Sequence, residues 1–185
     1  MSRVLVPLAD GFEEIEAISI IDVLRRGDIE VIVASLGSKK EVRGAHGVVV
    51  LADVEIQSVD VSALEMIVLP GGWKGTLALR DDENVQKILK IMDRDAKLIG
   101  AICAAPLALH SAGVLKHNYT CYPSVEAQIR EDGFSDKEMV VQDENVITSR
   151  GPATAMCFGL QIVKKLSGKE KFEEVKSALL ATHCN

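Results

Sequence analysis

The chain has 185 residues, 48% of them hydrophobic and 26% charged, which is the balance of a soluble globular protein with one domain. Its 21 Lys and Arg against 27 Asp and Glu give a formal net charge of -6, which argues against a nucleic-acid-binding surface. No apolar run is long enough to cross a membrane, and the N-terminal run is too short for a secretory signal, so we expect a cytoplasmic protein.

Short apolar runs alternate with amphipathic segments along the chain. We expect strands at 4–8, 29–36, 47–52, 66–70, 97–102 and 145–149. The runs are apolar on both faces, as in parallel strands that helices cover on either side. Helices are expected at 153–166, at 169–182 and at 13–26, the last with an apolar face of Ile15, Ile18, Ile21 and Leu24. The alternation predicts one α/β domain, residues 1–185, with a doubly wound and mostly parallel sheet.

Two segments depart from this alternation. Segment 37–52 carries three glycines around short β-like pieces, and segment 140–149 turns at Asp143–Asn145. Both are expected to form hairpins. The loops that follow the parallel strands matter more for function, because doubly wound sheets bind ligands beyond the carboxyl ends of their strands. Four such loops are ADGFEE (9–14), PGGWKG (70–75), CAAP (103–106) and RGPATA (150–155).

Cys103 occupies the turn between the strand that ends at 102 and a helix that ends near Gly113. The arrangement resembles a nucleophile elbow, in which a sharp, strained turn holds a reactive side chain. Small neighbours leave room for a substrate, and the N-terminus of the helix is expected to lower the pKa of the thiol. A buried cysteine that only fills space explains the position as well.

The other cysteines give no metal site. They stand at 121, 157 and 184, without C-x-x-C spacing or a histidine pair that would complete a zinc pattern. In a reducing compartment disulfides are not expected. We therefore expect four free thiols, no metal ion and no other cofactor.

Glu16 is the acid that could act together with Cys103. It lies in the first turn of the helix at 13–26, where acids commonly interact with the helix dipole. However, it shares a helical face with Ile20 and Val23, so it could point inward. A carboxyl in such surroundings has a raised pKa and could donate a hydrogen bond to a thiolate. A solvated first-turn acid is the simpler alternative.

Gly71 and Gly72 directly follow the strand at 66–70. They lack the spacing of a phosphate-binding loop. The pair is either a tight turn or an oxyanion site, whose backbone N–H groups would bind a carbonyl oxygen beside the nucleophile. Trp73 could cover such a pocket, although a lone tryptophan more often serves packing.

The four histidines supply no obvious base for Cys103. His110 lies seven residues further on, about two helical turns away. His46 lies in the 37–52 hairpin and could reach an active site from there. For each histidine a surface position is the simpler interpretation.

Five stretches together resemble the ThiJ/PfpI family, and most of all its Parkinsonism-associated deglycase branch. In the family's order they are LADGFEEIEA (8–17), DVLRRGDIEV (22–31), VLPGGWKG (68–75), LIGAICAAP (98–106) and ITSRGPATA (147–155). The resemblance implies a flavodoxin-like fold, usually assembled as a homodimer. It also implies that Cys103 is the reactive nucleophile and that Glu16 hydrogen-bonds its sulfur. The oxyanion site would fall on the backbone of Gly72 and Ala104, with Gly71 shaping the loop.

The chain departs from this pattern at two places. Animal members of the branch carry a histidine near the cysteine where this chain has Tyr122, and their hairpin arginine falls on or near His46. Tyr122 and His46 are therefore candidates for substrate binding. PfpI-type proteases carry a histidine immediately after the cysteine, where this chain has Ala104, so a peptidase is not expected.

The resemblance implies a cysteine-dependent enzyme, a glutathione-independent glyoxalase or a protein deglycase. Its substrates would be small reactive dicarbonyls such as methylglyoxal, or glycated proteins. The alternative is a non-catalytic redox sensor or oxidative-stress chaperone that works through oxidation of Cys103 to a sulfinate.

Overall fold

A computed structural model describes residues 1–185. Its main sheet contains β1 (Arg3–Leu8), β2 (Glu30–Ser35), β5 (Val54–Glu55), β6 (Met66–Leu69), β7 (Leu98–Ile102), β8 (Val140–Asp143) and β9 (Val146–Ser149). The strand order is β5-β2-β1-β6-β7-β9-β8, and every pair is parallel except β8 with β9. This arrangement confirms the predicted flavodoxin-like, mostly parallel sheet.

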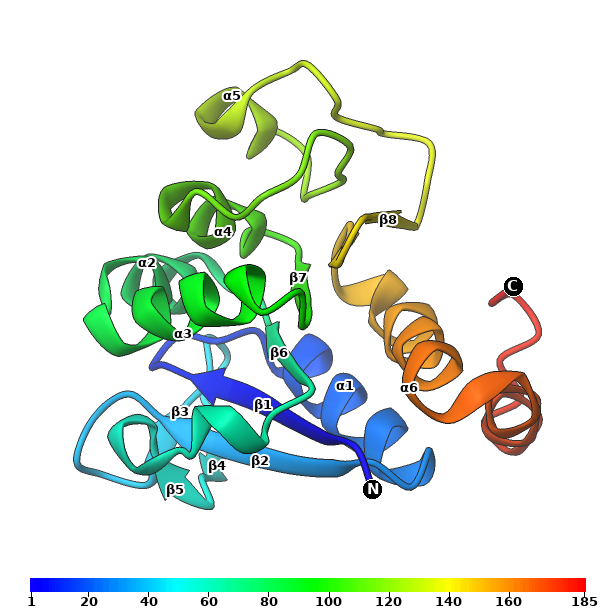
Figure 1. Cartoon of the computed structure of the whole chain (residues 1–185), viewed down its shortest axis with the longest axis horizontal. Coiled ribbons are helices and arrows are strands. Elements are labelled where there is room, and N and C mark those ends of the chain that lie inside the picture. Colours follow the sequence, from blue (N-terminus) through cyan, green and yellow to red (C-terminus); the bar gives the residue numbers. More distant parts are fainter.

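Helices cover both faces of the sheet (Figure 1). One layer holds α1 (Glu14–Arg26) and α6 (Ala155–Ala178), and the other holds α2 (Trp73–Asp81), α3 (Glu83–Arg94) and α4 (Pro106–Ala112). The alternating side chains of β1 reflect this sandwich, because Val4 and Val6 pack in the core with α1 and α6 while Leu5 packs in the core with α3 and α4. None of the helices combines the length and the apolar character that a membrane crossing requires.

Both predicted hairpins are present, but one predicted strand is misplaced. β8 and β9 form the expected antiparallel pair. The run at 47–52 does not join the parallel sheet. Its β4 (Val49–Leu51) pairs with β3 (Glu41–Arg43) in a separate two-stranded sheet, where Val49 and Leu51 are exposed. The apolar run at 47–52 therefore lies on the outer surface, within the predicted hairpin. The prediction that it is also a buried strand of the parallel sheet was wrong.

The predicted apolar face of α1 was also partly wrong. Ile15 and Ile18 are 58% and 44% exposed, whereas Ala17 and Ile20 are fully buried. Glu16 lies on the buried face, as its spacing from Ile20 indicated. Helix α1 thus has apolar residues on two sides, and sequence spacing alone favoured the outer one.

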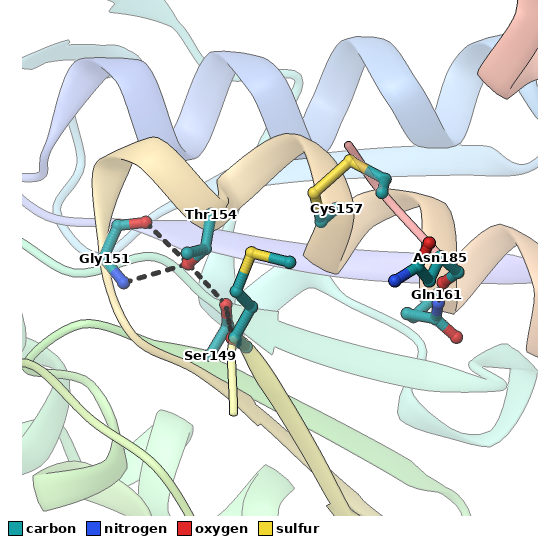
Figure 2. Close-up of a disulfide and its surroundings, with 8 residues drawn as sticks. Ser149, Gly151, Thr154, Cys157, Gln161 and Asn185 are labelled. Carbon is teal, nitrogen blue, oxygen red and sulfur yellow. Dashed lines mark hydrogen bonds between the residues drawn. A yellow bond between two sulfur atoms is a disulfide. The ribbon is translucent and has the colours of Figure 1, made fainter. Parts of the chain in front are cut away.

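The predicted helices at 153–166 and 169–182 are two parts of α6, which bends at Gly168 (φ 88°). The second part runs in a different direction from the first, and the C-terminal turn contacts the first turn of the helix. There Cys157 and Cys184 form a disulfide across a separation of 27 residues (Figure 2). The expectation of four free thiols was therefore wrong, because a bend within one helix brought two distant cysteines together. Cys103 and Cys121 remain free thiols.

Candidate active site around Cys103

Cys103 lies directly after β7 and has a left-handed backbone conformation, with φ 63°. That conformation costs a non-glycine residue roughly 1–3 kcal/mol and persists only where neighbours hold it in place. Here the Cys103 N–H donates to the Ser149 carbonyl at 3.0 Å, and its carbonyl accepts from the Tyr122 N–H at 2.9 Å. The end of β9 and the segment after α4 thus fix the strained elbow, which confirms the sharp turn predicted at this position.

The two glycines after β6 leave the space that the site needs. A Cβ atom on Gly71 would lie 2.6 Å from the Cys103 Cβ and 2.6 Å from Glu16 Oε2. Gly72 has φ 88°, and a Cβ there would lie 2.4 Å from the carbonyl oxygen of Gly11. Any larger residue at either position would push the loop away. The absence of these two side chains lets the cysteine and the glutamate approach each other.

Glu16 reaches this point from the first turn of α1 and is fully buried. Its Oε2 accepts a hydrogen bond from the Gly71 N–H at 2.8 Å, while Oε1 is buried without a hydrogen-bond partner. Burial raises the pKa of the Glu16 carboxyl to about 7, against the opposing effects of the Cys103 thiol and the Gly71 N–H. Near neutral pH this carboxyl is therefore poised to hold or release a proton.

The thiol of Cys103 does not have the lowered pKa that the helix position suggested. Burial and the charge of an ionised Glu16 raise the pKa of Cys103 to about 12, although the N–H groups of Gly72 and Ala104 act in the opposite direction. Two negative charges cannot easily coexist in this buried pair. A thiolate on Cys103 therefore requires the proton to stay on Glu16.

The sulfur faces a cavity of about 380 Å³. This volume is in the range of small-molecule sites. The cavity is lined by Trp73, Cys103, Ala104, Tyr122, Ser124, Val125 and Gln128. Trp73 and Tyr122 are among the residues that the sequence suggested for this place. Ser124, Val125 and Gln128 were not, because they come from the irregular segment around α5 (Glu126–Ile129), which carries no periodic signal.

His46 lies elsewhere. Its ring Nδ1 is 2.9 Å from Glu14 Oε2, and its side chain is 75% exposed. The backbone N–H groups of His46 and Val48 donate to Glu14 Oε1, so this carboxylate connects α1 to the β3–β4 hairpin. His46 is not among the residues that line the cavity at Cys103. The structure thus brings together six of the seven proposed site residues and leaves His46 outside them.

Two groups of side chains could offer ligands to a metal ion, and neither includes Cys103. One comprises Glu13, Glu14 and His46, and the other comprises Cys157, His183 and Cys184. In the first group, Glu13 already caps α1 by accepting from the Glu16 N–H at 2.8 Å. The site at Cys103 brings together a thiol, the carboxyl of Glu16 and the backbone N–H groups of Gly72 and Ala104.

Comparison with known proteins agrees with this geometry. Residues 2–165 match the DJ-1/PfpI family. The chain belongs to the DJ-1/PfpI family. This assignment confirms the resemblance drawn from the five sequence stretches, and the flavodoxin-like sheet is the fold that the family resemblance implied.

Members of the DJ-1/PfpI family from distant organisms match nearly the whole chain. Protein dj-1beta of Drosophila melanogaster is 41% identical over 181 residues, which cover 97% of each chain. Its crystal structure superposes with a TM-score of 0.93 over 97% of this chain and 98% of that one. Glutathione-independent glyoxalase DJR-1.2 of Caenorhabditis elegans is 38% identical over 170 residues, covering 91% and 89% of the two chains. Oxidized DJ-1 of Toxoplasma gondii is 37% identical, with a TM-score of 0.93 and coverage of 97% and 98%.

Proposed function

We propose that this chain is a glutathione-independent glyoxalase that converts small reactive dicarbonyls such as methylglyoxal into 2-hydroxy acids. One observation carries the proposal: a buried carboxyl with a pKa near neutrality meets a cysteine on a strained elbow, beside a cavity of about 380 Å³. The named glyoxalase of Caenorhabditis elegans, which is similar over most of both chains, supports it.

The residues account for each step of this conversion. The Cys103 thiolate attacks the aldehyde carbon and forms a C–S bond, and the carbonyl oxygen takes the proton from Glu16, which gives a hemithioacetal and leaves a carboxylate on Glu16. The N–H groups of Gly72 and Ala104 favour a negative charge on the Cys103 sulfur. They can therefore also stabilise an oxyanion that forms beside it. The carboxylate of Glu16 then removes the proton from the former aldehyde carbon and returns it to the adjacent carbon, while the hydroxyl proton moves to the oxygen of that adjacent carbon, so that a thioester with a 2-hydroxyl group forms. Water cleaves the resulting thioester, releases the 2-hydroxy acid and restores the thiol.

The test is the rate of lactate formation from methylglyoxal without added glutathione. We expect Cys103→Ser to show no rate above background and Glu16→Gln to lose roughly 10²–10⁴ in kcat, the usual contribution of a positioned acid or base. Cys121→Ser is the matched control, because Cys121 is also a buried free cysteine but is absent from the cavity lining. Equal rates in all four proteins would contradict the proposal.

The same attack would also release early glycation adducts from proteins, which is the deglycase form of the proposed activity. A glycated side chain would present its carbonyl at the mouth of the cavity, where Tyr122 is 49% exposed and Trp73 is 47% exposed. The dicarbonyl remains the substrate that the small cavity fits best.

A second candidate function is redox sensing by Cys103, and an oxidized structure of the Toxoplasma gondii relative favours it. Two molecules of peroxide would each transfer one oxygen to the sulfur and leave as water, giving a sulfinate. The N–H groups of Gly72 and Ala104 and a protonated Glu16 are suited to hold its oxygens. After mild peroxide treatment, peptide mass spectrometry should find two added oxygens on Cys103 and a free thiol on Cys121. Equal oxidation of both cysteines would contradict a tuned sensor.

We further propose that the chain forms a homodimer in the cytoplasm. Its interface would be an apolar surface formed by α1 and the β3–β4 hairpin. The surface consists of Ile15, Ile18, Val48 and Val49, all at least 44% exposed. Glu14 bonds to the N–H groups of His46 and Val48, so the two parts of the surface are connected. Clustered apolar side chains of this kind are typical of protein–protein interfaces.

A further inference from the structure

Three donor atoms converge at the beginning of α6, in a place that the proposed activity does not use. Cys157 comes from the first turn of α6, and His183 and Cys184 come from the C-terminal turn. Their sulfur and ring nitrogen atoms all lie within 4.8 Å of one another. Both cysteines are buried and the histidine is exposed, so the cluster lies at the edge of the core. Figure 2 shows the disulfide beside Gln161 and Asn185.

The oxidation state of the two cysteines decides what this cluster can bind. A disulfide offers no thiolate, and so it is a poor metal ligand. A dithiol reductant exchanges with the bond, becomes a disulfide itself and leaves two thiols on the protein. Two thiolates and one imidazole are the ligand set of a Cys₂His zinc site. Each thiol loses one proton when the metal binds.

The donors lie close enough together to reach the spacing of a tetrahedral ion once the disulfide is reduced. Zinc bonds of about 2.3 Å to sulfur and 2.0 Å to nitrogen place neighbouring ligand atoms roughly 3.5–4 Å apart. The His183 nitrogen, which lies within 4.8 Å of both sulfurs, therefore needs an adjustment of about 1 Å, while the two sulfurs, bonded to each other in the disulfide, must move apart to this spacing after reduction. Hydrogen bonds hold both sides of the cluster near these positions, because the Cys184 N–H donates to the Ala181 carbonyl and Gln161 Nε2 donates to the Asn185 carbonyl.

A cavity beside Cys157 leaves room for a fourth ligand. Its volume is about 300 Å³, which is far more than one water molecule requires. Polar side chains contribute to its lining, which comprises Glu138, Met139, Val140, Gln142, Ile147, Cys157, Gln161 and Asn185. A water molecule is therefore the natural occupant of the fourth position, and polar groups are available to orient it.

We propose that reduction of the Cys157–Cys184 disulfide creates a Cys₂His site for zinc or a similar thiophilic divalent cation, with His183 as the third protein ligand. The site is separate from Cys103 and does not depend on the proposed glyoxalase activity. Reduction and metal binding would exchange one crosslink between α6 and the C-terminal turn for another. The fold would thus keep this connection in both oxidising and reducing surroundings.

The experiment uses the whole chain with Cys103→Ser, so that the elbow cysteine cannot bind metal. A phosphine reduces the disulfide, taking an oxygen atom from water to become the phosphine oxide, and adds no competing thiol. Co²⁺ is the probe, because thiolate ligands give it a charge-transfer absorption. We expect one Co²⁺ per reduced chain, displaced by Zn²⁺, and none on the oxidised chain.

Substitutions of the three proposed residues test which of them bind the metal. Replacing both Cys157 and Cys184 with serine should abolish the absorption. His183→Gln should weaken Co²⁺ binding at least tenfold. Even the loss of a residue that only hydrogen-bonds to a metal ligand lowers metal affinity 10- to 100-fold. His117→Gln is the matched control, as another exposed histidine in a turn, and should change nothing. No absorption in the reduced chain, the same absorption in the oxidised chain, or unchanged affinity in His183→Gln would each overturn the proposal.

Discussion

At the level of single residues, the proton shared by Glu16 and Cys103 decides which of the two is charged. The Glu16 carboxyl is fully buried and has one strong partner, the Gly71 N–H at 2.8 Å. One hydrogen bond does not replace the hydration that a carboxylate loses on burial, and therefore the pKa rises. The pair carries a single negative charge above neutrality, and catalysis would need that charge to move between oxygen and sulfur.

This raised pKa predicts how stability changes with pH. The Glu16 pKa is about 7 in the folded chain, whereas an unperturbed carboxyl has a pKa of 4.5, so the unfolded chain ionises first as pH rises. The free energy of unfolding should therefore fall by about 3 kcal/mol between pH 4.5 and pH 7. Glu16→Gln cannot ionise and should not show this fall. Urea denaturation across this interval, with Cys103→Ser in both proteins so that Glu16 titrates alone, measures the difference.

The comparison of the two proteins cancels every other titrating group, because these are the same in both. Stability curves that run parallel from about pH 4 to pH 8 would show that Glu16 has an ordinary pKa. The proposed proton transfer would then lose its physical basis.

At the level of secondary-structure elements, one face of α1 contributes a residue to the candidate site, and another face lies on the outer surface of the protein. Its inner face places Glu16 under Gly71, whereas Ile15 and Ile18 remain exposed. If the exposed face forms the proposed dimer, Ile18→Glu should dissociate it, because a charge would be buried against an apolar partner. Light scattering during size-exclusion chromatography should give twice the chain mass of 20.0 kDa for the wild type and 20.0 kDa for the variant.

Leu180→Glu provides the matched control, since Leu180 is an 82% exposed apolar residue in the C-terminal turn. This variant should keep the mass of the wild type. A monomeric wild type, or a variant at Ile18 that remains dimeric, would contradict the proposed surface.

The sequence predicted most of the sheet because parallel strands are apolar on both faces, as β1, β6 and β7 are. It failed at β4, where Val49 and Leu51 are apolar but exposed. Hydrophobic character alone cannot separate a core from an outer surface that awaits a partner. For the same reason, the sequence predicted that the face of α1 with Ile15 and Ile18 is buried, although both residues are exposed.

The candidate site was largely predictable for a related reason. Cys103, Glu16 and Gly71 each follow or flank a strand end, and sequence order places strand ends at one edge of the sheet. The pKa of Cys103 was not predictable, because it depends on burial and on the charge of Glu16. The disulfide was not predicted, because the sequence positions of Cys157 and Cys184 do not reveal the bend at Gly168 that brings them together.

In the molecule as a whole, two kinds of sulfur chemistry occupy separate places in the fold. The free thiol of Cys103 lies directly after β7, beside the loop after β6 and the end of β9. One disulfide lies at α6, where Cys157 joins the C-terminal turn. The central claim is that the thiol of Cys103 alone carries the turnover of dicarbonyls.

Titration of the wild-type chain with iodoacetamide tests that claim most directly. Peptide mass spectrometry measures the alkylated fraction of Cys103 and Cys121, and lactate formation from methylglyoxal is measured in the same samples. We predict that activity falls in proportion to alkylation of Cys103 and reaches zero when that cysteine is fully modified, while Cys121 stays free. Full activity in a chain whose Cys103 is completely alkylated would contradict the account.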